Sequence, residues 1–485
     1  MQKLKSPAFA FESKDRVPVL SQLGSPDMDS VLAEILSIAE ELLQTEKASP
    51  RTPKIPAEEM AHEFDVSLPV TGKSQAEVLD LLGQLVRLTP KTSSRRFFNQ
   101  LFAGRAPMAT TGEMIASLLN SSMYTYKVGG PNILLEWELL QRMCSFAGFN
   151  NGDGTFLPGG SLANLVGMVL GRNRALPGYR EKGAQGKRLT MYISANGHYS
   201  VRKNAGLIGI GRENCIGVAV DEQGRMDPAA LQRQIEQDLK EGALPAVVIA
   251  TSGTTVRGSF DSIHDLADIC QKFDLWLHVD GAVGGTLLLH PQYREQLAGI
   301  ERADSLTWDA HKMMGVPLTC SALLVRDPEI LFDSFKEVAE YLFQSDSDHL
   351  NPGNRSIQCG RRNDALKLWA AWQRLGDEGW AQRIEKQMSL SRYAAKRISQ
   401  HSELELCEQP TFITVGFYVP GKSSEEICEQ LHVSGEAVIG YGDYGDRQAI
   451  RLVTMNPEVS ETEIDALLDA VVATAANLPT AVAAS

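Results

Sequence analysis

The sequence lacks the features of several protein classes. No apolar run reaches the roughly 18 to 20 residues that a membrane helix needs, and the beginning, MQKLKSPAFAFESKDR, has no signal-peptide h-region. Basic residues are in deficit, because 47 Lys and Arg against 60 Asp and Glu leave a net charge of −13. This balance argues against nucleic acid as a partner. We expect a cytoplasmic protein that binds neither membrane nor nucleic acid.

Cysteine is also scarce, and its pattern matches neither a disulfide framework nor a metal site. The cysteines are seven, an odd number, and they show neither a CxxC pair nor a His-paired metal-ligand spacing. Several stand in apolar runs, which predicts reduced, buried thiols and no bound metal. The seven are Cys144, Cys215, Cys270, Cys320, Cys359, Cys407 and Cys428.

The length and the pattern of elements predict an α/β protein of two or three domains. The chain has 485 residues, 43% of them hydrophobic, enough for a sizeable core. Residues 1–94 contain apolar stripes at helical spacing, broken by prolines. Strands and helices then alternate over 95–375, the pattern of a mostly parallel sheet in a large domain. Capping boxes and two strand-like runs over 376–485 predict a small C-terminal α+β domain.

The segment from Leu275 to Lys312 carries the most chemical information. The run LWLHVD places Asp280 at the end of one buried strand, and SLTWDAHK places His311 and Lys312 at the end of another. In an open α/β sheet this edge is where ligands bind. A buried carboxylate and a buried amine both need partners, and pyridoxal 5'-phosphate (PLP) offers one to each. The alternative is a structural aspartate and a surface lysine.

Three further segments fit a phosphate-bearing cofactor. PGGSLANLVG is a Gly-rich turn that opens a helix, so we expect free backbone N–H groups at Gly160, Ser161 and Leu162 to face a phosphate. His198 offers a ring that could stack on a cofactor, or it is structural. Thr251, with the neighbouring hydroxyls in ATSGTT, either binds the cofactor or caps a turn.

Five motifs occur in order: GHYSVRKNAG, ATSGTTVRGSFD, LWLHVDGAVGG, SLTWDAHKMMGVPLTCSALLV and IQCGRRNDALKLW. Together they resemble the PLP-dependent group II amino-acid decarboxylases, within them most closely the glutamate, cysteine-sulfinate and aspartate decarboxylase branch. The resemblance is strong from Arg95 to Trp380. It implies PLP as cofactor and the fold of the type I PLP-dependent transferases, with a large domain, a small C-terminal domain and an N-terminal helical segment.

The resemblance also implies roles for individual residues around PLP. Lys312 would be the Schiff-base lysine, and Asp280 the partner of the pyridine nitrogen. His198 would stack on the ring, Ala282 would pack on its opposite face, and His311 would lie at the cofactor as well.

Four residues are implied at the substrate. Arg451, in QAIRLVTMNP, matches the family arginine that holds the substrate carboxyl group, a task suited to a guanidinium because it binds carboxylate through two donors. Its alternative is an exposed strand arginine. Gln100, Leu101 and Phe102, in RRFFNQLFAG, match a stretch that lines the substrate pocket.

The chain departs from the family between YLFQ and IQCGRR, where relatives carry a flap with a proton-donating tyrosine. Here the segment is SDSDHLNPGNRS, which contains no tyrosine. His349 is its one side chain that titrates near neutrality, so we expect it to be the catalytic acid. The alternative is a solvated loop histidine, with the proton supplied by His198 or water.

The resemblance also implies a homodimer, because the N-terminal layer of the family packs on the partner subunit. The alternative is that the apolar helices of residues 1–94 are ordinary core helices. The expected reaction is α-decarboxylation of a small acidic L-amino acid. Aspartate, giving β-alanine, and cysteine sulfinate, giving hypotaurine, are preferred over glutamate, giving GABA. An aromatic or basic substrate, an aminotransferase reaction and a non-catalytic binding protein remain alternatives.

Overall fold

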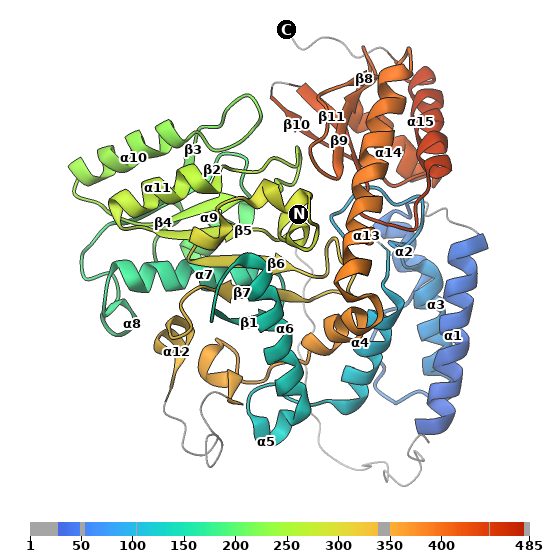
Figure 1. Cartoon of the computed structure of the whole chain (residues 1–485). Coiled ribbons are helices and arrows are strands. Elements are labelled where there is room, and N and C mark those ends of the chain that lie inside the picture. Colours follow the sequence, from blue (N-terminus) through green and yellow to red (C-terminus); the bar gives the residue numbers. More distant parts are fainter. Residues whose placement is uncertain (1–27, 49–53, 103, 338–349, 446, 480–485) are drawn as a thin grey trace. The chain divides into compact units, whose positions relative to one another are not determined.

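The computed structural model describes residues 28–48, 54–102, 104–337, 350–445 and 447–479 (Figure 1). These residues fall into two compact units. The first unit comprises residues 28–48 and 55–90, and the second comprises Lys54 and the described residues from Lys91 onward.

The first unit is helical. Its third helix begins with a capping box, in which Ser74 and Glu77 each bond the other's backbone N–H and so pair two donors that a helix start leaves free. An ion pair of 3.2 Å between Arg87 and Glu41 joins this helix to the first. The helices of this unit are α1 (Met28–Ala48), α2 (Ala57–Glu63) and α3 (Gln75–Leu88).

A seven-stranded sheet in the order β1-β7-β6-β5-β4-β2-β3 is the centre of the second unit. The pairs β6–β5, β5–β4, β4–β2 and β2–β3 are parallel, and β7 runs antiparallel to both of its neighbours. The prediction of an α/β fold with a mostly parallel sheet is confirmed. The strands are β1 (Asp153–Leu157), β2 (Leu189–Ser194), β3 (Cys215–Val218), β4 (Leu244–Thr251), β5 (Trp276–Asp280), β6 (Ser305–Asp309) and β7 (Ser321–Val325).

Helices cover both faces of this sheet. On one face α7 packs against β4, β5, β6 and β7, and α9 packs beside it; on the other lie α6, α10, α11 and η3. These helices are α6 (Pro131–Ala147), α7 (Gly160–Ala175), α9 (Tyr199–Leu207), α10 (Pro228–Lys240), α11 (Ile263–Phe273) and η3 (Gly284–Leu289). Around them lie α4 (Pro107–Leu119), α5 (Tyr126–Gly129), α8 (Tyr179–Lys182), η2 (Arg212–Asn214), η4 (Tyr293–Leu297), η5 (Ile300–Arg302), α12 (Ile330–Phe335) and η7 (Pro352–Arg355).

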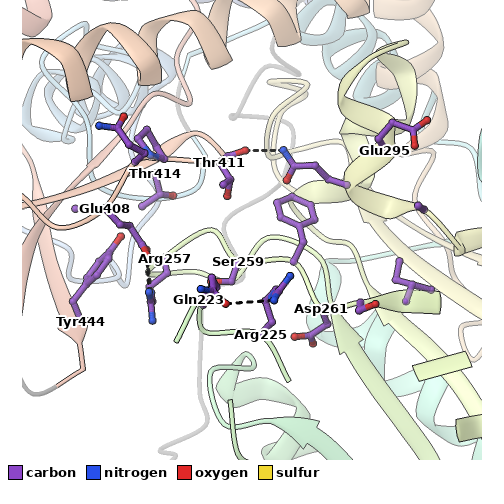
Figure 2. Close-up of a pocket in the computed structure, with 18 of the residues that line it drawn as sticks. Gln223, Arg225, Arg257, Ser259, Asp261, Glu295, Glu408, Thr411, Thr414 and Tyr444 are labelled. Carbon is purple, nitrogen blue, oxygen red and sulfur yellow. Dashed lines mark hydrogen bonds and ion pairs between the residues drawn. The ribbon is translucent and has the colours of Figure 1, made fainter. Parts of the chain in front are cut away.

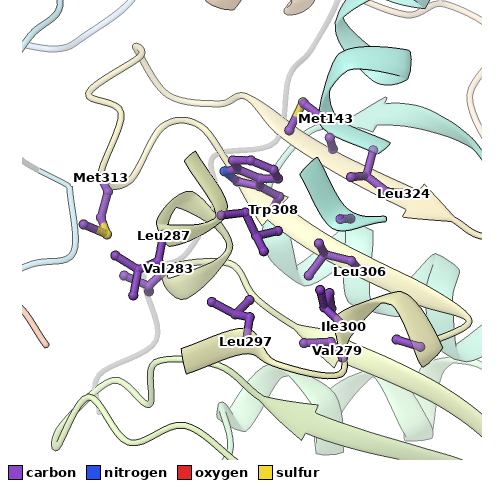
Figure 3. Packing of buried hydrophobic residues seen from close by; sticks show 14 of the residues in the cluster. Met143, Val279, Val283, Leu287, Leu297, Ile300, Leu306, Trp308, Met313 and Leu324 are labelled. Atoms are coloured by element: carbon purple, nitrogen blue, oxygen red, sulfur yellow. The ribbon is translucent and has the colours of Figure 1, made fainter. Parts of the chain in front are cut away.

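Strand alternation gives the two faces of the central strands different chemistry. On the face toward η3 and α6, β5 and β6 carry large apolar side chains, and Figure 3 shows Val279, Leu306 and Trp308 packed there. Trp308 is fully buried, and its indole N–H donates to Thr286 Oγ1 at 3.1 Å. The opposite face of the same strands, toward α7, carries polar side chains that include Asp280. A firm apolar layer therefore backs the polar groups of the ligand-binding edge.

A second sheet, β10-β11-β9-β8, is antiparallel throughout its described strands and has its own apolar core with α14 and α15. Of the capping boxes predicted for this region, one is complete: Ser460 and Glu463 form it at the start of α15. At the start of α14, Ser423 accepts from Glu426 N. A long helix, α13, precedes the sheet and is interrupted at Gly376, whose φ of 61° favours glycine. These elements are α13 (Ala365–Gln400), β8 (Glu405–Leu406), β9 (Thr414–Tyr418), α14 (Ser424–Ser434), β10 (Gly440–Tyr444), β11 (Arg447–Val453) and α15 (Glu461–Ala476).

The predicted state of the cysteines agrees with the structure. All seven lie among the described residues as free thiols; five are buried, Cys407 is half-buried and Cys359 is exposed. In the described part of the chain, no helix has both the length and the apolar character to cross a membrane.

Candidate active site

A cavity of about 280 Å³ opens at the carboxyl ends of β4, β5 and β6, the edge at which open α/β sheets bind ligands. Eight of the nine residues predicted at the cofactor line it, from five separate parts of the sequence. The lining residues are Pro158, Gly159, Gly160, Ser161, Asn164, His198, Ser200, Thr251, Gly253, Thr255, Asp280, Ala282, Val283, Asp309, His311 and Lys312.

Lys312 is the lysine of this cavity, and Asp309, which the motifs did not predict as a site residue, lies beside it. Asp309 Oδ2 lies 3.4 Å from Lys312 Nζ and 3.6 Å from His311 Nε2. Asp309 is buried, and its Oδ1 has no hydrogen-bond partner. A Cβ atom at Gly160 would overlap this carboxylate, so only glycine lets the start of α7 approach so closely. The amine therefore has a buried counter-charge within its own turn.

Asp280 is the last residue of β5 and is 5% exposed. Its Oδ2 accepts from Asn164 Nδ2 at 2.8 Å, and its Oδ1 accepts from the backbone N–H of Ala282 at 3.2 Å. Two donors thus offset part of the cost of burying this carboxylate. The remaining acceptor capacity of Asp280 faces the cavity that it lines.

The start of α7 gives the cavity an electropositive wall. Gly160 and Ser161 occupy the first turn of this 16-residue helix, where backbone N–H groups have no intrahelical acceptor. The expectation for Leu162 is wrong. Its N–H donates to the carbonyl of Gly159 at 3.0 Å, because the turn tightens there, and Leu162 does not line the cavity.

The hydroxyls that follow β4 divide into two kinds. Thr251 and Ser252 are buried, and neither hydroxyl has a hydrogen-bond partner. Thr254 Oγ1 accepts from Ser259 N at 2.9 Å, so this threonine does cap a turn. Of the two hydroxyls that lack a partner, that of Thr251 belongs to a residue of the cavity wall. It is available to a ligand.

His198 has a structural role at the start of a helix, and its ring also lies at the cavity. As the N-cap of α9 it accepts from Ser200 N at 3.3 Å, and Nδ1 lies 2.7 Å from Ser200 Oγ. The ring also lines the cavity. Burial lowers the pKa of His198, opposed by Asp280, while the charge of Lys312 lowers it further. The imidazole is therefore a neutral, fixed aromatic surface at neutral pH.

A second, larger cavity of about 550 Å³ is lined by residues 257 and 259–261 together with Glu408, Thr411, Thr414 and Tyr444 of the C-terminal region (Figure 2). Several of its charged groups are engaged in ion pairs or hydrogen bonds. Arg257 forms a two-donor ion pair with Glu408, and Asp261 accepts from Met226 N and Thr251 N. No lysine lies among its lining residues. The smaller cavity, not this one, carries the reactive groups.

Comparisons with known proteins agree with the site. Residues 56–419 match the family described as "Pyridoxal-dependent decarboxylase conserved domain". The chain belongs to this family. Cysteine sulfinic acid decarboxylase of Mus musculus is 38% identical over 434 residues, 85% of this chain and 88% of that protein. Acidic amino acid decarboxylase GADL1 of Homo sapiens is 38% identical over 437 residues, 85% of this chain and 84% of that protein. The crystal structure of mouse CSAD superposes with a TM-score of 0.87 at 34% identity, covering 93% of this chain and all of that one.

This member of the pyridoxal-dependent decarboxylase family is thus a PLP-dependent amino-acid decarboxylase, as its motifs predict. The cavity fits the cofactor on its own chemistry. A helix start and the unpartnered Thr251 hydroxyl suit a phosphate, the Lys312 amine suits an aldehyde, and the Asp280 carboxylate suits a pyridine nitrogen. Among the described residues, no cluster of His, Cys, Asp or Glu could hold a metal ion.

The described substrate residues predicted for the decarboxylase do not line this cavity, although Arg451 contacts one of its residues. Arg451 is 8% exposed, so the alternative of an exposed strand arginine is wrong. Its Nη1 donates to the carbonyl of Thr255, a cavity residue, and its Nη2 to the carbonyl of Asn99, each at 2.7 Å. Next to Asn99, Gln100 is exposed, and Leu101 and Phe102 are half-buried. His349 lies outside the described residues.

Proposed function

We propose that this decarboxylase removes the α-carboxylate of a small acidic L-amino acid, with aspartate and cysteine sulfinate preferred over glutamate. One observation carries the proposal: a single cavity brings together the Lys312 amine, the Asp280 carboxylate and the start of α7. The choice of substrate is supported by the likeness, at 38% identity, to proteins named cysteine sulfinic acid decarboxylase and acidic amino acid decarboxylase.

Each group of the cavity has a proposed task. Lys312 binds the cofactor covalently, and Asp280 binds its pyridine nitrogen. His198 and Ala282 hold the two ring faces. Gly160, Ser161, Thr251 and His311 complete the cofactor site. Bound PLP supplies an electron sink for the pair of electrons that CO2 leaves behind.

We propose that Arg451 binds the carboxyl group of the substrate. Two of its nitrogen atoms bond backbone carbonyls, which fixes the guanidinium between residues 99 and 255. Its Nε is buried and has no hydrogen-bond partner, so one donor is available to an anion. Burial lowers the pKa of Arg451, and an anionic substrate would compensate for this loss of hydration.

Arg451→Lys should lower kcat/KM by roughly 10-fold to 100-fold, the order of a hydrogen bond to a charged group. PLP affinity should change by less than about threefold, because Arg451 does not line the cofactor cavity. The control is Arg447→Lys on the same strand, where Arg447 is half-exposed and pairs with Glu405; this variant should keep wild-type kinetics. Equal losses of kcat/KM and PLP affinity in Arg451→Lys would place Arg451 outside the substrate site.

We propose His349 as the acid that delivers a proton to the substrate α-carbon after CO2 departs. In His349→Phe, CO2 release should continue while amine formation slows, so oxygen and water compete and give aldehyde, ammonia and hydrogen peroxide. His349→Tyr restores a proton donor and should restore clean amine formation. Amine, aldehyde and peroxide are measured per CO2. An unchanged rate and product ratio in His349→Phe would return the proton to His198 or solvent.

We also propose a cytoplasmic homodimer, with residues 1–94 as a helical dimerisation segment, 95–375 as the cofactor-binding domain and 376–485 as the small domain. The homodimer is supported by exposed apolar side chains on α5 and α6, where Val128, Leu134 and Trp137 are 60%, 45% and 50% exposed. Side chains of this size are usually covered in a stable assembly.

A substrate panel tests the proposed function. The holoenzyme is given L-aspartate, L-cysteine sulfinate, L-glutamate, L-tyrosine and L-lysine, and CO2, amine and keto acid are measured for each. We expect kcat/KM for one of the first two to exceed that for tyrosine and lysine by at least about 10²-fold, because a site that pairs a substrate charge rejects an analogue without it. Highest kcat/KM for tyrosine or lysine, or keto acid in place of CO2, would overturn the proposal.

A further inference from the structure

A continuous chain of buried polar side chains leads from the interior of the sheet to Asp280. Ser305, His278 and Asn164 are 0%, 0% and 2% exposed. His278 Nδ1 lies 2.8 Å from Ser305 Oγ, and His278 Nε2 lies 2.9 Å from Asn164 Oδ1. Asn164 Nδ2 donates to Asp280 Oδ2 at 2.8 Å. At its far end, Ser305 Oγ accepts from the indole N–H of Trp276 at 2.9 Å.

Local structure places these residues together. His278 and Asp280 are two apart on β5 and so share one face, and the register sets Ser305 of β6 beside His278. Asn164 and Gly167 are three apart on α7 and lie on one side of that helix. A Cβ atom at Gly167 would overlap the imidazole of His278, so this glycine makes room for the ring. The chain thus depends on a close approach of α7 to the sheet.

The direction of every hydrogen bond follows from the two ends. The carboxylate of Asp280 can only accept, so the Asn164 amide must turn its NH2 group toward it and its carbonyl toward His278. His278 Nε2 must then carry a hydrogen. Burial lowers the pKa of His278 to about 4 despite the opposing charge of Asp280, so the ring is neutral and Nδ1 is an acceptor. The Ser305 hydroxyl donates to Nδ1, and the indole of Trp276 donates to Ser305.

Every donor in the chain therefore points toward Asp280. Hydrogen bonds aligned in this way polarise one another, and in a dry interior their effect on a charge is strong. The reverse alignment requires an Nδ1–H tautomer and a flipped Asn164 amide, which would turn its oxygen toward the carboxylate. A charged Asp280 forbids that arrangement.

We propose that Ser305, His278 and Asn164 are positioning residues that form a one-directional donor chain, which orients the carboxylate of Asp280 toward the cofactor nitrogen. His278 is the central link, neutral and protonated at Nε2. Each of the three acts on the cofactor through Asp280, not by contact with the reacting atoms. The inference rests on the proposed role of Asp280 as partner of the pyridine nitrogen.

The first test reads the tautomer of His278 in the wild-type holoenzyme. The holoenzyme is labelled with ¹⁵N-histidine, and long-range ¹H–¹⁵N correlation spectra identify the tautomer of each ring, with His278→Gln used for assignment. We expect the neutral Nε2–H tautomer for His278 at pH 7. An Nδ1–H tautomer or a protonated ring overturns the proposal, whatever the activity of the enzyme.

The second test uses a matched pair of substitutions at His278. The amide of His278→Gln reaches the position of Nε2 and can still donate to Asn164, whereas that of His278→Asn reaches only the position of Nδ1. We expect the dissociation constant of PLP to rise about tenfold in His278→Asn and by less than about threefold in His278→Gln. The control is Thr307→Val, because Thr307 Oγ1 lies 3.4 Å from His278 Nε2 without belonging to the chain; its PLP affinity should not change.

Equal PLP affinities in the Gln and Asn variants would overturn the proposal, because a role in filling space does not distinguish the two ends of the ring. If His278→Asn fails to fold, the tautomer in the wild-type holoenzyme still decides. The donor chain and the proposed role of Asp280 can be rejected independently. A wrong tautomer with an inactive Asp280→Asn variant rejects the donor chain alone, whereas the expected tautomer with an active Asp280→Asn variant rejects the role of Asp280.

Discussion

Lys312→Ala should abolish decarboxylation, with kcat lower by roughly 10⁴-fold or more. The amine of Lys312 is the one that the cofactor cavity presents, and Asp309 at 3.4 Å is its counter-charge. Without this amine the enzyme cannot bind PLP covalently. The visible absorbance of the holoenzyme should therefore disappear, although the start of α7 and the Thr251 hydroxyl can still hold some PLP by its phosphate.

Borohydride reduction followed by peptide mass spectrometry measures this effect directly. In the wild type, the adduct should map to the peptide that contains Lys312. Lys203→Ala is the control, because Lys203 is exposed on α9 and does not line the cavity, and this variant should keep both absorbance and turnover. A reducible covalent adduct in Lys312→Ala would reject Lys312 as the cofactor lysine.

The position of Lys312 and Asp280 in one cavity could be predicted because it depends on local patterns. Each follows a continuous apolar run, and such runs form buried strands of a parallel sheet. The carboxyl ends of neighbouring parallel strands meet at one edge. The sequence therefore predicts that these two distant residues meet, and the prediction does not require the strand register.

Asp309, Asn164 and His278 were not predicted, because their roles depend on how elements pack. Asp309 lies beside Lys312 only because the chain turns sharply after β6. Asn164 reaches Asp280 only because α7 lies close to β5, an approach that Gly167 permits. A signal was present in HVD, since residues two apart on a strand share a face, but the partner of His278 is set by the register of β6.

One error of prediction and one alternative that the structure excludes have local causes. Leu162 was expected to offer a free N–H, yet the tight first turn of α7 directs it to the carbonyl of Gly159. The alternative of an exposed Arg451 failed because β11 is an inner strand of its sheet and the segment around Asn99 closes over it. No sequence pattern predicts the hydrogen bond of Leu162 to Gly159 or that of Arg451 to Asn99.

Asp280→Asn should slow decarboxylation by roughly 10²-fold to 10³-fold, the cost of removing one preorganised electrostatic partner from a buried site. The substitution preserves shape and removes the charge, so the pyridine nitrogen of bound PLP loses the anion that holds its proton. PLP should still bind, since Lys312 and the start of α7 are unchanged. The measurements are kcat, by CO2 release, and the visible absorbance of the purified variant.

The control for this variant is Asp268→Asn, because Asp268 is 70% exposed and pairs with Arg302 at the surface, where an ion pair contributes little. Its kcat should match the wild type. A lower kcat with retained absorbance in Asp280→Asn separates the electronic role of Asp280 from cofactor retention, because a carboxylate needed only for binding would lose both together. Near-normal turnover would instead make Asp280 a structural residue, held by Asn164 and Ala282 for the stability of the sheet edge alone.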